Sequence, residues 1–133
     1  PEFSTFGTLE VASNATFVTT ADLHITKSLT NSGTFQAEKV YLEPVENEIT
    51  ITGQSGDSSD IANKTKISEL YCINQAGKNL VINNAISVGK IALSGSSDNR
   101  LSIIGNGIIY LETLFAFLLQ FLQNQRELAQ RYF

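Results

Sequence analysis

Short runs of alternating apolar and polar residues follow one another along most of the chain, up to about residue 112. Typical runs are "LHIT" at 23–26, "EITITG" at 48–53 and "GIIYLE" at 107–112, and Asn, Gly, Ser and Asp separate such runs. Every second side chain of a strand lies on the same face, so each run predicts one buried face and one outward face. The pattern therefore predicts an all-β fold of short strands.

The apolar residues of the N-terminal part recur every six positions, at Val11, Phe17, Leu23, Leu29 and Phe35. The dipeptide Thr-Phe also recurs, at 16–17 and 34–35, which is three such steps. A repeating inward residue is what a chain needs when it winds into coils whose strands stack in parallel sheets. The six-residue step is lost beyond residue 43, where longer corners such as residues 53–66 would interrupt the count without breaking a coil. We predict a parallel β-helix, or β-solenoid, over residues 4–112.

An antiparallel sandwich is the alternative, because it also consists of short strands with regular turns. Tight hairpins favour the dipeptides Asn-Gly and Asp-Gly. Only one Asn-Gly occurs, within "GNG" at 105–107, and Asp-Gly is absent. The Asn-rich corners suit open bends better than tight reversals, which favours the solenoid.

The stretches "LHITKSLTNSGTFQAEKVYL", "EITITGQSG" and "LYCINQAGKNLVINNAISVGKIALSG" resemble the β-helical repeat regions of bacterial surface proteins. Such repeats occur in autotransporter-type passengers and in the large secreted adhesins of Bacteroidetes. The resemblance covers roughly residues 7–112 and brings no invariant catalytic or binding residue with it. It implies a right-handed parallel β-helix that serves as a stalk, a spacer or an adhesive surface. The chain lacks a translocating barrel, a recognisable sorting tail and the Gly-Gly-x-Gly-x-Asp repeats that bind calcium.

The composition changes near the end of the chain, since no glycine follows Gly107 and no Ser or Thr follows Thr113. The run "LFAFLLQFL" at 114–122 is too short to span a membrane, which takes about 20 apolar residues. On a helix it forms a wide apolar arc, so we predict an amphipathic α-helix over residues 113–133. This helix would cap the open end of the solenoid core or pair with a second copy of the chain. The residues predicted to form this cap or interface are Leu114, Phe115, Phe117, Leu118, Phe121, Leu122 and Leu128.

Charge and cysteine content narrow the classes of partner. The chain has 9 basic and 13 acidic residues and a net charge of −4, so it lacks the basic surface that attracts nucleic acid. The polar side of the predicted helix carries Gln and Asn with few cations, which disfavours binding at a membrane interface. Cys72 is the single cysteine, so no internal disulfide can form. The opening Pro1-Glu2-Phe3 is interpreted as a cloning remnant, and residues 1–3 are left out of the predicted domain.

Few residues suggest chemistry. His24, the single histidine, lies between Leu23 and Ile25 and is predicted to be a solvated outward residue. Cys72 is predicted to fill the core. One histidine and one cysteine are too few for the usual zinc sites, and we expect no cofactor. A "TIT" triplet occurs once, at 50–52, whereas an ice-binding solenoid would need a Thr-x-Thr in every coil.

Carboxylates are the remaining candidates, because paired acids can hydrolyse polysaccharides. Four of them crowd one segment, at Glu38, Glu43, Glu46 and Glu48, and two more, Asp57 and Asp60, lie in the "GDSSD" loop. We interpret both groups as solvated turns. A cleft that gathers acids of the first group beside Asp57 or Asp60 would favour an enzyme, and the same loop is a weak candidate for calcium.

The sequence as a whole predicts a non-catalytic structural or adhesive module of a bacterial cell-surface or secreted protein. Its flat polar faces would contact a glycan or a protein partner. A polysaccharide-active β-helix enzyme or phage-tail module is one alternative. A module that builds a homo-oligomer through its C-terminal helix is another.

Overall fold

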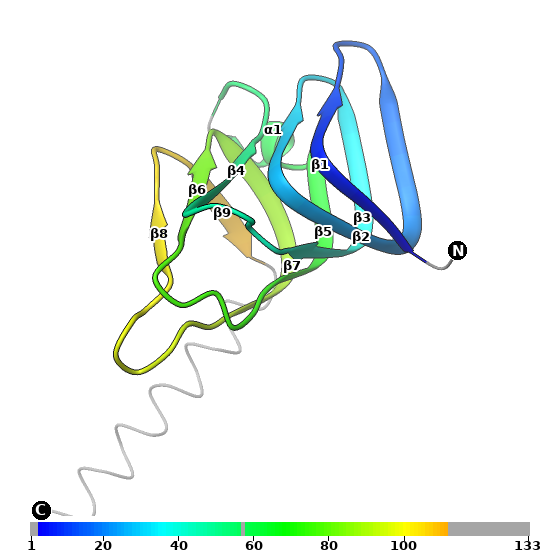
Figure 1. Cartoon of the computed structure of the whole chain (residues 1–133). Coiled ribbons are helices and arrows are strands. Elements are labelled where there is room, and N and C mark those ends of the chain that lie inside the picture. The colour runs from blue at the N-terminus through cyan, green and yellow to red at the C-terminus, as the bar shows by residue number, and fades with distance from the viewer. Residues whose placement is uncertain (1–2, 57, 112–133) are drawn as a thin grey trace, which may run out of the picture.

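One curled β-sheet of nine strands makes up most of the molecule and has the shape of half a barrel (Figure 1). The computed structural model describes residues 3–56 and 58–111. The strands are β1 (Phe3–Val11), β2 (Thr16–Asn31), β3 (Thr34–Leu42), β4 (Glu48–Thr52), β5 (Thr65–Cys72), β6 (Asn79–Asn83), β7 (Ala85–Leu93), β8 (Ser102–Ile104) and β9 (Ile108–Leu111). A single-turn helix, α1 (Ser59–Ala62), lies between β4 and β5 and contacts β5, β7 and β9.

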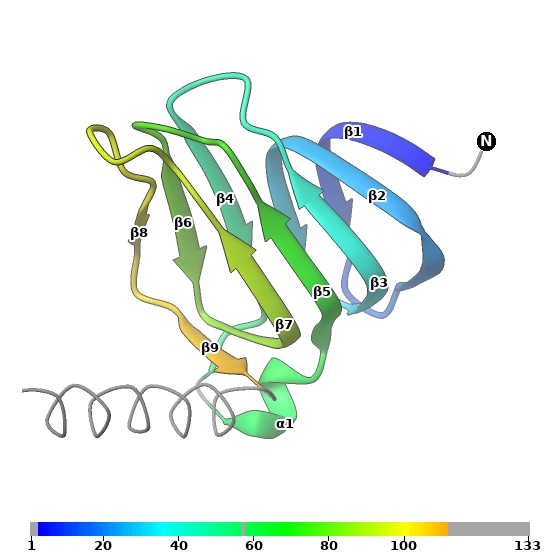
Figure 2. The ribbon, with the colours of Figure 1, turned by 90° about the horizontal axis from the view of Figure 1, so that it is seen from below.

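All strand pairs of the sheet are parallel, in the order β8-β6-β4-β2-β3-β5-β7-β9, with β1 also paired to β2. The long strand β2 belongs to both wings of the sheet, since its first half pairs with β3 and its second half with β4. From β4 onward each strand pairs with the strand two before it, so the chain alternates between the wings (Figure 2). The antiparallel sandwich is therefore wrong for the described residues, and the predicted parallel pairing is confirmed.

Inward apolar side chains fill the space between the two wings and stack in register from strand to strand. On one wing Leu29 pairs with Ile51, and Ile51 pairs with Ile82. On the other wing Val40 pairs with Leu70. All five of these side chains are buried. Each such column removes aliphatic surface from water, which is the main stabilising contribution to a fold of this kind.

The residues of the six-residue repeat found in the sequence lie in this core or pack against it. Val11, Leu23, Leu29 and Phe35 are buried, and the partly buried Phe17 packs against them. Phe17 and Phe35 are register partners, and their rings stack with centroids 5.5 Å apart and an interplanar angle of 6°. The interval of 18 residues between the Thr-Phe dipeptides at 16–17 and 34–35 is thus the length of chain that returns to the same place on the neighbouring strand.

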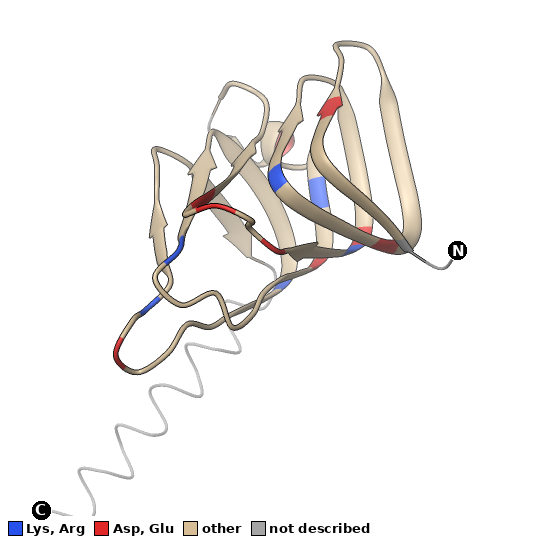
Figure 3. Ribbon diagram, viewed as in Figure 1, with Lys and Arg blue, Asp and Glu red and all other residues tan. Residues whose placement is uncertain are grey.

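Two consecutive residues face outward in the middle of β3 and of β5. They bend the second wing of the sheet, which consists of β3, β5, β7 and β9. Ala37 and Val40 of β3 are buried, whereas Glu38 and Lys39 between them are not. In β5 the outward pair is Ser68 and Glu69. Such an extra outward residue kinks a strand and raises its twist, as a β-bulge does. Charges gather along this bend (Figure 3), where register partners alternate in sign through Asp22, Lys39, Glu69 and Lys90.

The core is open at the last pair of strands within the described part of the chain. Ile103 of β8 is the register partner of the fully buried Leu80, yet 52% of its surface is exposed. Ile104, which follows it, and Ile108 at the start of β9 are also exposed. The helix predicted over 113–133 lies outside the described residues. The same holds for all of its predicted cap or interface residues, Leu114, Phe115, Phe117, Leu118, Phe121, Leu122 and Leu128.

Candidate functional site

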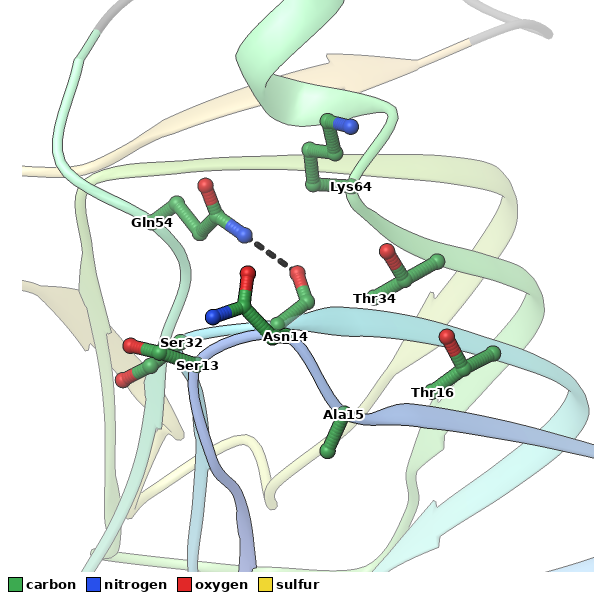
Figure 4. Close-up of a pocket in the computed structure, with 9 residues that line it drawn as sticks. Ser13, Asn14, Ala15, Thr16, Ser32, Thr34, Gln54 and Lys64 are labelled. Atoms are coloured by element: carbon green, nitrogen blue, oxygen red, sulfur yellow. Dashed lines mark hydrogen bonds between the residues drawn. The ribbon is translucent and has the colours of Figure 1, made fainter.

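Three connections of the chain meet at one corner of the sheet and line an open polar hollow with a volume of about 370 Å³. They are the turn from β1 to β2, the turn from β2 to β3, and the segment that carries α1 from β4 to β5. Figure 4 shows Gln54 and Lys64 on one side of the hollow and Ser13, Ala15 and Thr16 on the other. The complete lining is Ser13, Asn14, Ala15, Thr16, Ser32, Gly33, Thr34, Gln54 and Lys64.

The two turns are tight and are hydrogen-bonded to each other. Asn14 has a φ of 66°, a left-handed conformation that asparagine tolerates better than most residues. The amide of Ala15 donates to the carbonyl of Ala12 at 3.0 Å, and the amide of Thr34 donates to the carbonyl of Ala15 at 2.9 Å. Gly33 is required here, because a Cβ at this position would lie 2.3 Å from the carbonyl oxygen of Ala15.

Hydrogen bonds also hold the backbone on the opposite side of the hollow, from which the lining side chains extend. Asn31 is 1% exposed, and its amide nitrogen donates to the carbonyl of Lys64 at 2.8 Å and to the hydroxyl of Thr65 at 2.7 Å. Its oxygen accepts from the amide of Gly33 at 3.0 Å. The amide nitrogen of Gln54 donates to the carbonyl of Gly33, the dashed line in Figure 4. The hollow is therefore preformed rather than a gap between loose loops.

Neutral polar groups dominate the chemistry of this hollow. Its lining offers hydroxyls from Ser and Thr, the amide of Asn14 and one ammonium group, that of Lys64, and no Asp or Glu lines it. Lys64 is exposed and takes part in neither of the two ion pairs formed within the described residues. Such groups donate and accept hydrogen bonds without a reactive nucleophile or base. The arrangement suits binding better than catalysis.

A second hollow of about 350 Å³ adjoins the first one and shares Ser32 and Gln54 with it. Its lining is Thr30, Asn31, Ser32, Thr52, Gly53, Gln54, Ser55 and Asn84. The side-chain amide of Asn84 donates to the carbonyl of Gly53 at 3.0 Å, which holds the connection from β6 to β7 at this corner. Together the two hollows make a polar surface that runs across several strands.

Rows of hydroxyls extend this surface over the outer face of the first wing, which consists of the second half of β2 with β4, β6 and β8. Thr8 pairs with Ser28 and Ser28 with Thr50, while Thr30 pairs with Thr52. The hydroxyl of Ser28 donates to that of Thr8 at 3.3 Å. The sequence alone showed one Thr-x-Thr triplet, at 50–52, and the register now places Ser28-Leu29-Thr30 beside it. Sequence reasoning missed this row because the two segments are 22 residues apart and only the strand register aligns them.

His24 faces outward as predicted, but the prediction that it is merely solvated is wrong. Its Nδ1 is hydrogen-bonded to a carboxylate oxygen of Glu43, and its ring stacks on Tyr41 with centroids 4.8 Å apart. Tyr41 in turn stacks on Tyr71 at 5.0 Å, and the ammonium of Lys90 lies 5.8 Å from the Tyr71 ring centroid. The three rings are register partners on β2, β3 and β5. Since their faces cover one another, this column joins strands and leaves the middle ring no free face for a sugar.

Tyr71 donates its hydroxyl hydrogen to the carboxylate of Glu69 at 2.6 Å. This hydrogen bond, followed by partial desolvation, raises the pKa of Tyr71 to about 12. Cys72, next to it, is fully buried as the sequence predicts, and burial raises the pKa of its thiol to about 11. Neither group is poised as a nucleophile near neutral pH.

The predicted carboxylates do not assemble into one site. Glu43 is bound to His24, Glu46 and Glu48 lie at the connection from β3 to β4, and Asp60 lies in α1 at another corner. Asp57 lies outside the described residues. Glu38 instead lines a hollow of about 260 Å³ together with Glu69, a pairing that the sequence did not suggest. Within the part of the chain that the structure describes, no three His, Cys, Asp or Glu side chains come together as metal ligands would.

No protein-family model, curated protein or solved structure matches this chain. The resemblance to the β-helical regions of bacterial surface proteins therefore stays a prediction. Among the described residues, no helix has the length and apolar character needed to cross a membrane.

Proposed function

We propose that this chain is a β-solenoid module with a structural or adhesive role and without catalytic activity, from a bacterial cell-surface or secreted protein. The parallel pairing of each strand with the strand two before it supports the solenoid, because a chain that winds in coils produces that order. The intervals between register partners lengthen from 18 residues at Phe17 and Phe35 to 30 at Phe35 and Thr65. A solenoid accommodates such differences as longer corners.

The half-exposed Ile103 supports a cap at the C-terminal end of this solenoid. A core that ends in exposed isoleucines and unpaired strand edges promotes association unless it is covered. The chain continues directly after β9 into the apolar run at 114–122, within reach of that end. We infer that residues 113–133 form the covering helix. Pairing of this segment with a second copy of the chain is the competing arrangement.

The observation that carries the adhesive role is the preformed polar corner, in which hydroxyl and amide side chains of several strands line two adjoining hollows. Hydroxyl and amide groups recognise the hydroxyl groups of a glycan through hydrogen bonds, and ordered water bridges what they do not contact directly. Open, shallow hollows of this kind fit a glycan chain that lies on the surface better than a small enclosed ligand.

A glycan array probed with the full chain tests the adhesive role. The matched variants are Ser32→Tyr, which places a large neutral side chain where both hollows meet, and Ser102→Tyr, the same change at an exposed position of β8. We expect binding by the unmodified chain and by Ser102→Tyr, and loss of binding by Ser32→Tyr. Absence of binding across a broad array would reject the adhesive role and leave a spacer.

Glu38 and Glu69 support one competing function, the hydrolysis of a polysaccharide, because two acids that line one hollow are the minimum for that reaction. The carboxylate of Glu69 accepts a hydrogen bond from Tyr71 and lies 3.9 Å from the ammonium of Lys90, so both contacts compete with a substrate for it. Release of reducing sugar that disappears in both Glu38→Gln and Glu69→Gln would establish the enzyme and overturn our proposal.

A further inference from the structure

We propose that the corner hollow binds an anionic sugar, with Lys64 as the counter-charge. This inference rests on the adhesive function proposed above and names its ligand class. The hollow is the 370 Å³ space lined by nine residues, of which Lys64 alone is charged. A ligand that used only the neutral groups would leave that ammonium unpaired, whereas a sugar carrying a carboxylate or a sulfate would pair with it.

The position of Lys64 is fixed at its backbone. Its carbonyl oxygen accepts hydrogen bonds from the side chain of Asn31 at 2.8 Å and from the amide of Phe35 at 2.8 Å. Both donors belong to residues that are at most 1% exposed, so the root of the lysine is anchored in the core. A lysine with an anchored root loses less conformational freedom when it binds than one on a loose loop.

Charges elsewhere on the molecule favour the same assignment. The chain carries a net charge of −4, and Lys90 of the outer sheet face lies 3.9 Å from the carboxylate of Glu69. Lys39 has Asp22 and Glu69 as its register partners on the two sides. Lys64 has no such carboxylate among the residues that line its hollow. The net charge repels an anion from the molecule as a whole, and Lys64 supplies the attractive charge at this hollow.

The remaining lining supplies what a sugar ring needs around its charged group. Thr16 and Thr34 are register partners on β2 and β3, so their hydroxyls lie side by side on one wall (Figure 4). Asn14 and Ser13 lie on the turn that closes the hollow. No hydrogen bond within the described residues engages the side chains of these four residues or of Ser32. They are free to bind the hydroxyls of the sugar, which explains why the site would select a saccharide over a simple anion.

The test measures binding of oligogalacturonate, its methyl ester and a sulfated galactan of similar length to the full chain by calorimetry. The ester keeps the sugar and removes the charge. We expect the acid to bind about ten- to hundredfold more tightly than the ester, the range for a hydrogen bond to a charged group. Lys64→Gln should abolish that difference, whereas Lys66→Gln, the same change two residues away and outside the hollow, should retain it.

Each outcome decides a separate point. Equal binding of the acid and the ester would overturn the anionic class and leave the adhesive function standing. Equal losses from Lys64→Gln and Lys66→Gln would overturn the site, because they would indicate general attraction by net charge. Preference for the sulfated galactan over the acid would retain the site and assign the sulfate. Absence of binding to all three probes and to a broad glycan array would reject both the site and the adhesive function.

Discussion

At the scale of single residues, one buried side-chain amide links the two sides of the corner hollow. Asn31 is enclosed at the corner where β2 ends, and it satisfies three polar groups of other residues, those of Gly33, Lys64 and Thr65. Buried polar atoms without a partner are absent from the described side chains. A buried donor or acceptor that loses its partner costs about 1–3 kcal/mol. The corner hollow depends on this residue because it holds both of its sides.

Replacement of Asn31 by Ala should lower the free energy of unfolding by about 2–4 kcal/mol, since it removes the side-chain partner of the buried amide of Gly33 and of the buried hydroxyl of Thr65. Urea denaturation measures this difference, with an unchanged slope as the check that the same surface unfolds. Asn63→Ala, at the exposed end of α1, is the control and should change stability by less than about 0.5 kcal/mol. Similar losses in both variants would contradict the role given to Asn31.

Cys72 predicts a pH dependence. In the folded chain its pKa is raised from the ordinary value of 9.0 to about 11, because burial disfavours the thiolate. The unfolded chain therefore loses this proton first, and stability falls as pH rises from about 9 to about 11, whereas below pH 9 the contribution is fully present. Tyr71, with a pKa raised from 10.0 to about 12, adds a loss in the same direction at higher pH.

Unfolding free energies measured between pH 8 and 10 should fall with pH for the unmodified chain and fall less for Cys72→Val, which keeps an apolar side chain in the same place. The thiol should also stay unreactive towards a thiol reagent at pH 8 until urea unfolds the chain. Rapid reaction in the folded state would show that the thiol is not enclosed.

At the scale of elements, columns of side chains join each strand to the next on both faces of the sheet. Inside, the columns are aliphatic, with the Phe17–Phe35 stack at one end. Outside, rings stack from His24 through Tyr41 to Tyr71, and charges alternate along the bend beside them. Cross-strand pairs of these kinds each contribute a fraction of a kcal/mol to about 1.5 kcal/mol. They fix the register that brings the corner turns together.

Tyr41→Ala removes the ring between two neighbours and should lower the free energy of unfolding by about 1–3 kcal/mol, the sum of two stacked pairs. A double-mutant cycle with Tyr71→Ala should give a coupling energy of about 0.5–1.5 kcal/mol between the two rings. Val18→Ala on β2, where the side chain is 61% exposed, is the neutral control. Strict additivity in the cycle would mean that the rings only lie near each other.

At the scale of the whole molecule, the sheet has open edges at β1 and at the strands β8 and β9. The second of these ends exposes Ile103, Ile104 and Ile108 within the described residues. Exposed apolar side chains beside unpaired backbone groups favour association with other chains. How the chain covers this end decides whether it is a monomer or an assembly.

A chain that ends after Glu112 should aggregate, whereas the full chain should be a monomer, if the segment after β9 covers the exposed isoleucines as we propose. Light scattering gives the solution mass of both. Phe117→Asp with Phe121→Asp in the full chain should act like the truncation, and Gln120→Asp with Asn124→Asp is the matched control on the predicted polar side. A full chain that is a defined oligomer, with a soluble monomeric truncation, would instead assign this segment to an interface between copies.

The sequence by itself determined the all-β class, the burial of Cys72 and the inward positions every six residues from Val11 to Phe35. These features follow from local alternation and spacing, because successive side chains of a strand lie on opposite faces. The sequence also favoured parallel strands over a sandwich, since the hairpin dipeptides are nearly absent. The helix predicted over 113–133 and its cap residues lie outside what the structure describes, and they remain predictions.

Only the tertiary structure decided what lies on the outer surface. The tertiary structure places His24 against Glu43 and Tyr41. It aligns Ser28 and Thr30 with Thr50 and Thr52. It separates the acids that lie close together in the sequence. It also brought Asn14, Thr34 and Lys64, which belong to three separate connections, around one hollow. The physical reason is register. The connections between strands differ in length, and these differences decide which residues of distant strands become neighbours. No local pattern of apolar and polar residues shows this pairing.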